Sequence, residues 1–65
     1  MNIIEIKVDK TNDENRFDPN GKNWFLSVRF SNNSRFGVEL KPEMSKSDIV
    51  FELVKFANLL ITKIP

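Results

Sequence analysis

Residues 45–64 constrain the fold more than any other stretch, because their side chains follow the period of an α-helix. At about 100° per residue, the apolar side chains gather on one broad side of that helix. They are Ile49, Val50, Leu53, Val54, Phe56, Ala57, Leu60, Ile61 and Ile64. Ser45 and Asp48 have the spacing of a capping box, and Pro65 cannot continue the helix. An apolar side this broad requires a second layer to cover it.

Three shorter stretches, residues 2–8, 23–31 and 35–41, alternate apolar and polar side chains as β-strands do. Their apolar sides form one face, which we expect the helix to cover. That face consists of Ile4, Ile6, Val8, Trp24, Leu26, Val28, Phe30, Phe36, Val38 and Leu40. The sequence therefore predicts a single α+β domain over residues 1–65. It is a three-stranded antiparallel β-meander with one C-terminal α-helix packed on one face, a β-β-β-α two-layer sandwich.

Residues 9–22, between the first two strands, lack an apolar period and are rich in turn-forming residues. Within them, the Asp-Pro-Asn-Gly sequence at residues 18–21 matches a type I turn. We expect a long solvated loop whose one large apolar side chain, Phe17, packs against the body of the domain. A loop of this length can also carry a binding function.

The connection at residues 31–34, Ser-Asn-Asn-Ser, predicts a hairpin with an odd number of loop residues. An odd loop is needed to place Phe30 and Phe36 directly opposite each other on one face. The simplest such loop is residues 32–34, with one Asn in the left-handed conformation. Gly37, in the middle of the third strand, indicates a bulge or a close approach by another chain, and we favour the bulge.

A chain of 65 residues buries only a small core, so its stability is marginal. It has no Cys and no His, which removes disulfides and the commonest transition-metal ligands and leaves association as a route to extra stability. We expect a cytoplasmic protein without a signal peptide, a membrane span, a metal or a cofactor. The many Asn, Lys, Ile and Phe residues are typical of an AT-rich genome, such as that of a bacterium or its phage.

The residue types that catalysis commonly needs are missing or explained by the fold. With neither His nor Cys, a nucleophile would have to be Ser, Thr or Lys, and the chain contains no GxSxG motif. The Ser-Lys-Ser-Asp sequence at residues 45–48 is accounted for by the start of the helix. The adjacent carboxylates Asp13 and Glu14 lie in the long loop. We therefore predict that the protein is not an enzyme and has no catalytic residues.

The net charge of +1, from ten basic and nine acidic residues, is too balanced to indicate nucleic acid or anionic lipid by itself. The outer face of the sheet is nevertheless expected to be basic around one aromatic ring. It would carry Lys7, Arg29, Arg35, Lys41 and Phe25, against Glu5 and Glu39. Such faces bind single-stranded nucleic acid through phosphate contacts and base stacking, although the same pattern is typical of an ordinary solvated sheet face.

Residues 36–43, FGVELKPE, are similar to the strand-to-helix corner of the PC4-like family of single-stranded DNA-binding proteins. The similarity covers these eight residues, and the basic sheet of that family has no counterpart elsewhere in the chain. Single-stranded nucleic-acid binding by the outer sheet face is therefore the alternative function. Its expected contact residues are Phe25, Arg29, Arg35 and Lys41.

The helix provides the basis for the preferred interpretation, which is protein binding. Phe51 and Leu59 lie on its otherwise polar side, on either side of Lys55. In a domain this small they predict a contact with a partner protein or with a second copy of the chain. Together with Phe17 in the loop they are the expected protein-binding residues, and strand addition at a sheet edge is a further route. We predict a small protein-binding module, either a homodimer or an inhibitor or adaptor of another protein.

Overall fold

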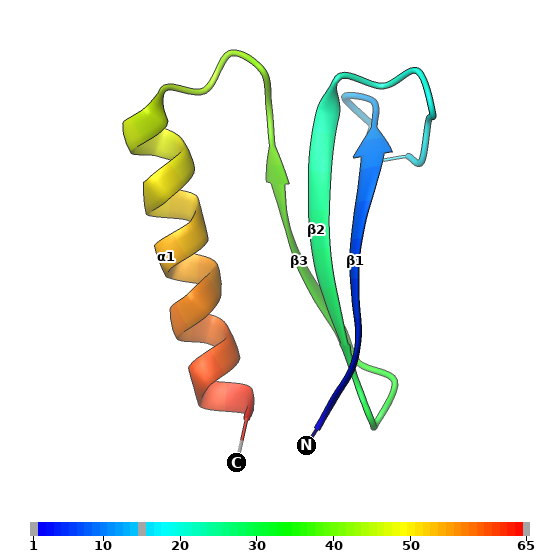
Figure 1. The fold of residues 1–65 in the computed structure, drawn as a ribbon, viewed down its shortest axis with the longest axis vertical. Helices are drawn as coiled ribbons and strands as arrows, with labels where there is room; N and C mark the ends of the chain where they lie inside the picture. Colours follow the sequence, from blue (N-terminus) through cyan, green and yellow to red (C-terminus); the bar gives the residue numbers. More distant parts are fainter. Residues whose placement is uncertain (1, 15, 65) are drawn as a thin grey trace.

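The computed structural model describes residues 2–14 and 16–64. In chain order its elements are β1 (Ile3–Thr11), β2 (Asn23–Phe30), β3 (Arg35–Leu40) and α1 (Lys46–Lys63). The strands form one antiparallel sheet in the order β1-β2-β3, and α1 runs alongside β3 (Figure 1). Its Phe56 side chain packs against Val28, Phe30 and Val38 on one face of the sheet. The predicted β-β-β-α fold of the α+β class is therefore confirmed. Within the described residues, no helix combines the length and the apolar character needed to cross a membrane.

The helix begins as its sequence predicts. The Ser45 hydroxyl accepts a hydrogen bond from the Asp48 backbone N–H at 3.1 Å, and the Asp48 carboxylate accepts one from the Ser45 backbone N–H at 3.4 Å. This capping box satisfies two backbone donors that the first turn of a helix would otherwise leave unpaired. At the other end Ile64 is already extended, and Pro65 lies outside the described residues.

β1 is three residues longer than its alternating pattern predicts. Asp9, Lys10 and Thr11 continue the strand and pair with Phe25, Trp24 and Asn23 of β2. The pattern failed here because all three side chains are polar, so neither face of the strand shows as apolar. Contacts with side chains of β2 and β3 compensate for this polarity. The Lys10 ammonium lies 5.1 Å from the centre of the Trp24 ring, and the buried Thr11 hydroxyl donates to the Glu39 carboxylate.

The hairpin between β2 and β3 has the expected odd loop, shifted by one residue. The Phe30 backbone N–H donates to the Ser34 carbonyl, so the loop consists of residues 31–33 rather than 32–34. Asn33 has the left-handed conformation, with φ of 68°, at the loop position where a three-residue hairpin requires it. Phe36 consequently pairs with Val28 instead of Phe30, while both aromatic side chains remain on the inner face.

The bulge predicted at Gly37 is wrong. The pairing of β2 with β3 runs without interruption from Trp24 opposite Leu40 to Arg29 opposite Arg35. Gly37 is needed for another reason: a Cβ atom there would lie 2.4 Å from Cζ of Phe25, because that ring lies across the glycine. The irregularity of the sheet lies instead in β1, where the register shifts between Ile3 and Glu5.

The core lies where α1 meets β2 and β3. Phe56, in the middle of the helix, packs with Val28, Phe30 and Val38, and all four side chains are buried. The partly buried side chains around them are Leu26, Phe36, Leu40 and Leu60. The rings of Phe30 and Phe36 meet edge to face with their centres 5.8 Å apart, a favourable arrangement for two aromatic rings. Of the four buried side chains in the described core, β2 supplies two, and β3 and α1 supply one each.

The long loop is held by its backbone. The Asp18 N–H donates to the Lys10 carbonyl at 3.0 Å, and the Gly21 N–H donates to the Asp18 carbonyl at 2.8 Å, which closes the predicted turn. Gly21 also approaches β1 so closely that a Cβ atom would lie 2.1 Å from the Thr11 carbonyl oxygen. The Phe17 side chain is 69% exposed, so the prediction that it packs against the domain is wrong.

Candidate functional site

The helix leaves the β1 side of the inner sheet face uncovered. Ile6 and Val8 are 66% and 57% exposed, and Ile4 and Trp24 are each about half exposed. A helix with its side chains is about 10–12 Å across and neighbouring strands are about 4.8 Å apart, so one helix covers about two strands. α1 runs along β3, which is the edge strand on the opposite side of the sheet from β1 (Figure 1). The inner face of β1 is therefore left uncovered. The prediction that the helix covers these four residues is therefore wrong.

The helix also has an apolar stripe that the sheet does not cover. At about 100° per residue, the positions that follow the buried Phe56 around one side of the helix are apolar, apart from Lys46 in the first turn. In angular order the apolar ones are Ile49, Leu60, Leu53, Ile64, Ala57, Val50, Ile61 and Val54. The last three of these are each more than half exposed. The apolar side of α1 is thus wider than the contact it makes within the chain.

Leu60 and Leu53 of this stripe lie within about 60° of Phe56, whereas Val50, Ile61 and Val54 lie about 120–160° around the helix from it. On the other side of Phe56, Leu59 and Glu52 line a groove together with Gly37 of β3, which marks the side of the helix that faces the outer edge of the sheet. The stripe starts on the opposite side of Phe56. We call this stripe and the uncovered part of the inner sheet face together the open apolar face. It consists of Ile4, Ile6, Val8, Trp24, Val50, Leu53, Val54, Ile61 and Ile64.

A shallow apolar depression of about 530 Å³ continues the open apolar face along the first half of α1. Val50, Phe51 and Val54 line it, with Lys46 and Ser47 at its rim. Phe51, one of the predicted protein-binding residues, is therefore an immediate neighbour of this face, and its ring is 62% exposed. The apolar surface available to a partner is larger than the Phe51 side chain alone.

The other predicted protein-binding residues do not join it. Leu59 lies about 80° around the helix from Phe51, in the groove beside β3, and is 39% exposed. Lys55 lies on the polar side, where its ammonium is 5.3 Å from the centre of the Phe51 ring and 3.7 Å from the Glu52 carboxylate. Phe17 belongs to the distant loop. The structure thus splits the predicted protein-binding set of Phe51, Lys55, Leu59 and Phe17 over three locations.

The predicted nucleic-acid residues do share the outer face of the sheet, but acidic side chains accompany them. Glu5 of β1 lies opposite Arg29, and its carboxylate is 3.6 Å from Arg29 Nε and 3.4 Å from Arg35 Nη2. A single carboxylate therefore bridges both arginines across the sheet. Two of the cations expected to bind phosphate are engaged with protein instead.

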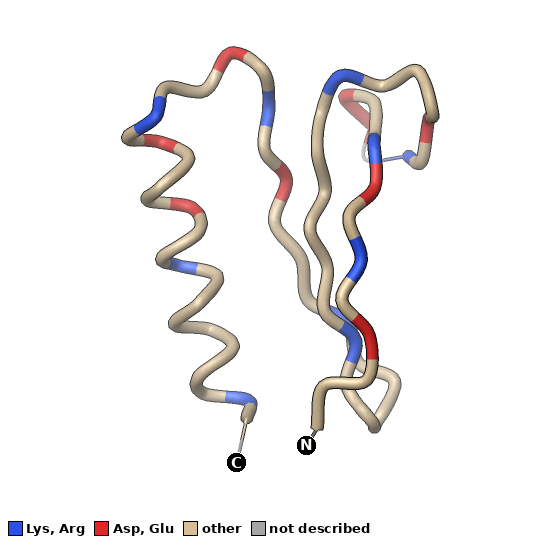
Figure 2. The backbone as a smooth tube through the Cα atoms, in the orientation of Figure 1, with Lys and Arg blue, Asp and Glu red and all other residues tan. Residues whose placement is uncertain are grey.

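The longer β1 adds another acidic residue to the outer face. Asp9 lies 3.9 Å from the Lys7 ammonium, so the charges along this strand alternate in sign (Figure 2). Phe25, the expected stacking platform, is half-buried with its ring over Gly37. Lys41 follows the end of β3. The face made by Phe25, Arg29, Arg35 and Lys41 is charge-balanced, and nucleic-acid binding by it stays a prediction.

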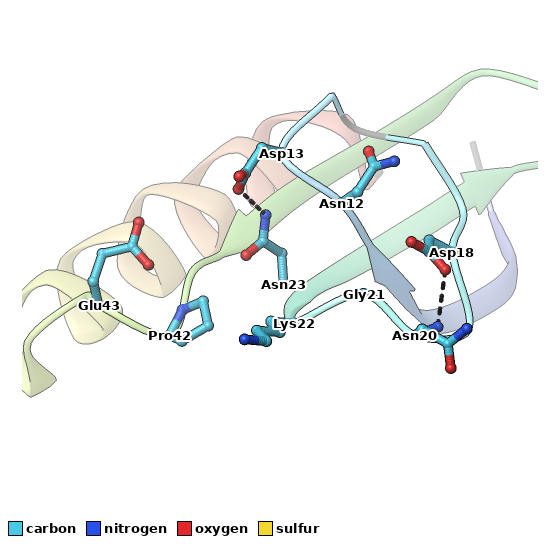
Figure 3. A pocket seen from close by; sticks show the side chains of 9 residues that line it. All are labelled: Asn12, Asp13, Asp18, Asn20, Gly21, Lys22, Asn23, Pro42 and Glu43. Carbon is cyan, nitrogen blue, oxygen red and sulfur yellow. Dashed lines mark hydrogen bonds between the residues drawn. The ribbon is translucent and has the colours of Figure 1, made fainter.

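A polar recess of about 350 Å³ lies where the long loop meets the connection between β3 and α1 (Figure 3). The residues lining it are Asn12, Asp13, Asp18, Asn20, Gly21, Lys22, Asn23, Pro42 and Glu43. The side-chain amide of the buried Asn23 donates to the Asp13 carboxylate at 3.2 Å, and the Asp18 carboxylate accepts from the Asn20 backbone N–H at 2.9 Å. These bonds attach the loop to itself and to β2.

Asn12 at the recess is used in the same way. The Asn12 side-chain oxygen accepts from the backbone N–H groups of Glu14 and Arg16, at 2.9 and 3.2 Å. Among residues 2–14 and 16–64, no cluster of three or more acidic side chains is arranged as a metal-binding group. We interpret the recess as a structural joint that fixes the loop after β1.

Comparison with known protein families, with curated proteins and with solved structures finds no match to this chain. The similarity of residues 36–43 to the PC4-like family gains no support from these comparisons. The candidate surfaces are therefore judged on their geometry alone, and by that measure the open apolar face is the leading candidate.

Our sequence reasoning missed this face, although the sequence carried a signal for it. Nine of the eleven apolar positions of residues 45–64 form one side that takes up roughly half the circumference of a helix, more than contact with one sheet requires. The inner face of three strands is likewise wider than one helix. Comparing the two widths would have shown that neither layer could cover the other completely.

Proposed function

We propose that this protein acts by binding another protein chain through the open apolar face. The single observation that supports the proposal is the exposure of nine large apolar side chains on the inner sheet face and on α1, against four buried ones in the described core. Their uncovered area is on the order of 800 Å², larger than the biggest apolar patch of a typical monomer, about 300–600 Å². Patches of that size in soluble proteins mark interaction sites.

The magnitudes favour a bound state. Removing about 800 Å² of apolar surface from water contributes on the order of 20 kcal/mol at about 25 cal/mol per Å². Association costs about 4–15 kcal/mol in lost translational and rotational freedom. Ordering of side chains and desolvation of imperfectly paired polar groups add to that cost, so the buried area supplies a driving force but does not fix the affinity. Two lysines border the face, Lys46 beside Val50 and Val54 and Lys10 over the Trp24 ring, and both ammonium groups lie at its ends.

In this proposal the protein is not an enzyme but a homodimer, an inhibitor or an adaptor that works by occupying a surface. Phe51 would border the contact, while Leu59, Lys55 and Phe17 would lie outside it. We further propose a cytoplasmic location and an AT-rich bacterial or phage genome as the source. The absence of Cys supports the first, and the abundance of Asn, Lys, Ile and Phe supports the second.

Affinity capture with matched baits tests the proposal. The wild-type chain and two double variants, Ile6→Asn/Ile61→Asn and Lys7→Asn/Lys55→Asn, are tagged and exposed to a lysate of the source organism, and light scattering gives the mass of each purified chain. The first variant alters the open apolar face, and the second alters neighbouring residues that point away from it. We expect the wild type and the second variant to form a stoichiometric protein complex, with themselves or another protein, and the first variant to lose it. The reverse ranking of the two variants would contradict the proposal.

A further inference from the structure

We propose that the partner covering the open apolar face is a second copy of this chain, with α1 of each copy lying over β1 of the other. This inference rests on the proposed function, because it names the occupant of the same face. It replaces the dimer surface expected from the sequence, which was centred on Phe51 and Leu59.

The first argument is that each copy lacks what the other copy offers. The inner face of β1 is an apolar strip about one strand wide that lacks a helix, and the stripe on α1 is an apolar helix surface that lacks a sheet. The stripe extends from the sheet contact around the side of α1 opposite the groove that Leu59 lines. A two-fold axis places the stripe of each copy on the strip of the other, so both uncovered surfaces are buried at once. Such self-complementarity is what a symmetric dimer interface requires.

The second argument is the area. Standard interfaces bury about 800 Å² on each partner, and the open apolar face has an area of that order. The whole chain has an accessible surface of 4806 Å², so the contact would cover roughly one-sixth of it. Interfaces of permanent homodimers are also more apolar than the rest of the surface, as this face is.

The third argument is the charge around the face. No charged residue interrupts α1 between Lys55 and Lys63, and the residues of the β1 strip itself are uncharged up to Lys10 at its end (Figure 2). A strongly charged partner would find nothing to pair with at the centre of this surface. An equally uncharged surface fits it, and a net charge of +1 leaves little repulsion between two copies.

The fourth argument is stability. Within the described residues the buried apolar core consists of Val28, Phe30, Val38 and Phe56. Domains of this size commonly need a disulfide, a metal or association to be stable, and the chain has no Cys or His. A second copy is present wherever the first one is made, so dimerisation supplies the missing burial without another gene product.

Sedimentation equilibrium over a wide range of protein concentration gives the first test. We expect twice the mass of the chain for the wild type and for Lys7→Gln, which alters the outer face. Val8→Lys places a charge in the interface twice, once for each copy, and should raise the dimer dissociation constant by about a hundredfold or more. A wild type that is monomeric at every concentration would overturn the inference.

Cross-linking keeps the test decisive if Val8→Lys does not fold. The chain has no Cys, so two single-cysteine chains can be mixed without background reaction. Val8→Cys mixed with Val54→Cys should give a covalent heterodimer with a short bis-maleimide. The outer pair, Lys7→Cys mixed with Lys55→Cys, should not, because these residues point away from the proposed interface. A covalent dimer from the outer pair in place of the inner pair would overturn the assigned face.

These measurements separate the two proposals. A monomeric chain that still captures a different protein, with capture lost in Ile6→Asn/Ile61→Asn, would remove the second copy and leave the proposed function in place. A monomeric chain that captures nothing would remove both. A dimer joined by the inner cysteine pair supports both.

Discussion

The two halves of the inner sheet face have the same kind of side chains and very different burial. Val28 of β2 is 3% exposed and pairs with Ile6 of β1. Val8, two residues further along β1 on the same face, is 57% exposed. Both residues are valines on the same face, so residue type does not explain the contrast. The position of α1 along β3 does. An alternating strand pattern therefore tells which side chains share a face, and the neighbouring layer determines whether that face is dry.

The largest expected effect on stability comes from the half of the inner sheet face that α1 covers. Phe30→Ala removes a fully buried ring that packs edge to face with Phe36. We expect it to lower the free energy of unfolding by about 3–5 kcal/mol, most of the stability of a domain this small. Urea unfolding followed by circular dichroism measures the loss. Phe51→Ala is the exposed aromatic control and should change stability by less than about 0.5 kcal/mol. Equal losses for the two variants would contradict the assigned core.

The same substitution of valine by alanine on β2 and on β1 tests the contrast in burial directly. Val28→Ala should cost about 2 kcal/mol at any protein concentration, because its cavity lies within one chain. Val8→Ala should cost less than about 1 kcal/mol in dilute protein and more as concentration rises, because its covering layer belongs to the second copy. Thermal unfolding over a hundredfold range of concentration separates them. Identical, concentration-independent losses would show that a single chain covers β1.

A smaller effect is expected where the covering helix begins. Ser45→Ala removes the hydroxyl that accepts from the Asp48 backbone N–H and should cost about 1 kcal/mol. Amide hydrogen exchange should rise in β3, which α1 covers, more than in β1, which it does not cover within the chain. Ser47→Ala, in the first turn and exposed, is the control and should have little effect. Equal loss of protection in β1 and β3 would argue against the contrast between the two halves.

The smallest effect is expected on the outer face. Glu5→Gln removes the carboxylate that bridges Arg29 and Arg35, and because all three side chains are partly exposed the loss should stay below about 1 kcal/mol and shrink at high salt. The same variant makes both arginines available to phosphate. We expect fluorescence anisotropy to detect no binding of single-stranded DNA by the wild type at low salt. Salt-sensitive binding that Arg29→Ala/Arg35→Ala abolishes would assign the function to the outer face.

The local features could be predicted from the sequence because they depend on neighbours in the chain. Ser45 and Asp48 cap the helix, residues 18–21 form the predicted turn, and an Asn closes the hairpin in the left-handed conformation. The inner and outer faces follow from period-two alternation, and the strand order follows the order of the strands in the chain. Residues 9–11 were missed because their polar side chains mask strand periodicity, and Gly37 was misread because the reason for it is the Phe25 ring on another strand.

The sequence by itself determined which elements form, which side chains share a face and where the helix starts. Only the tertiary structure decided where α1 lies across the sheet, and with that which apolar residues stay exposed. The physical reason is that helix periodicity and strand alternation are local, whereas coverage depends on the width of one layer relative to another. One helix over three strands leaves an apolar strip open, and that strip is the surface from which the function is inferred.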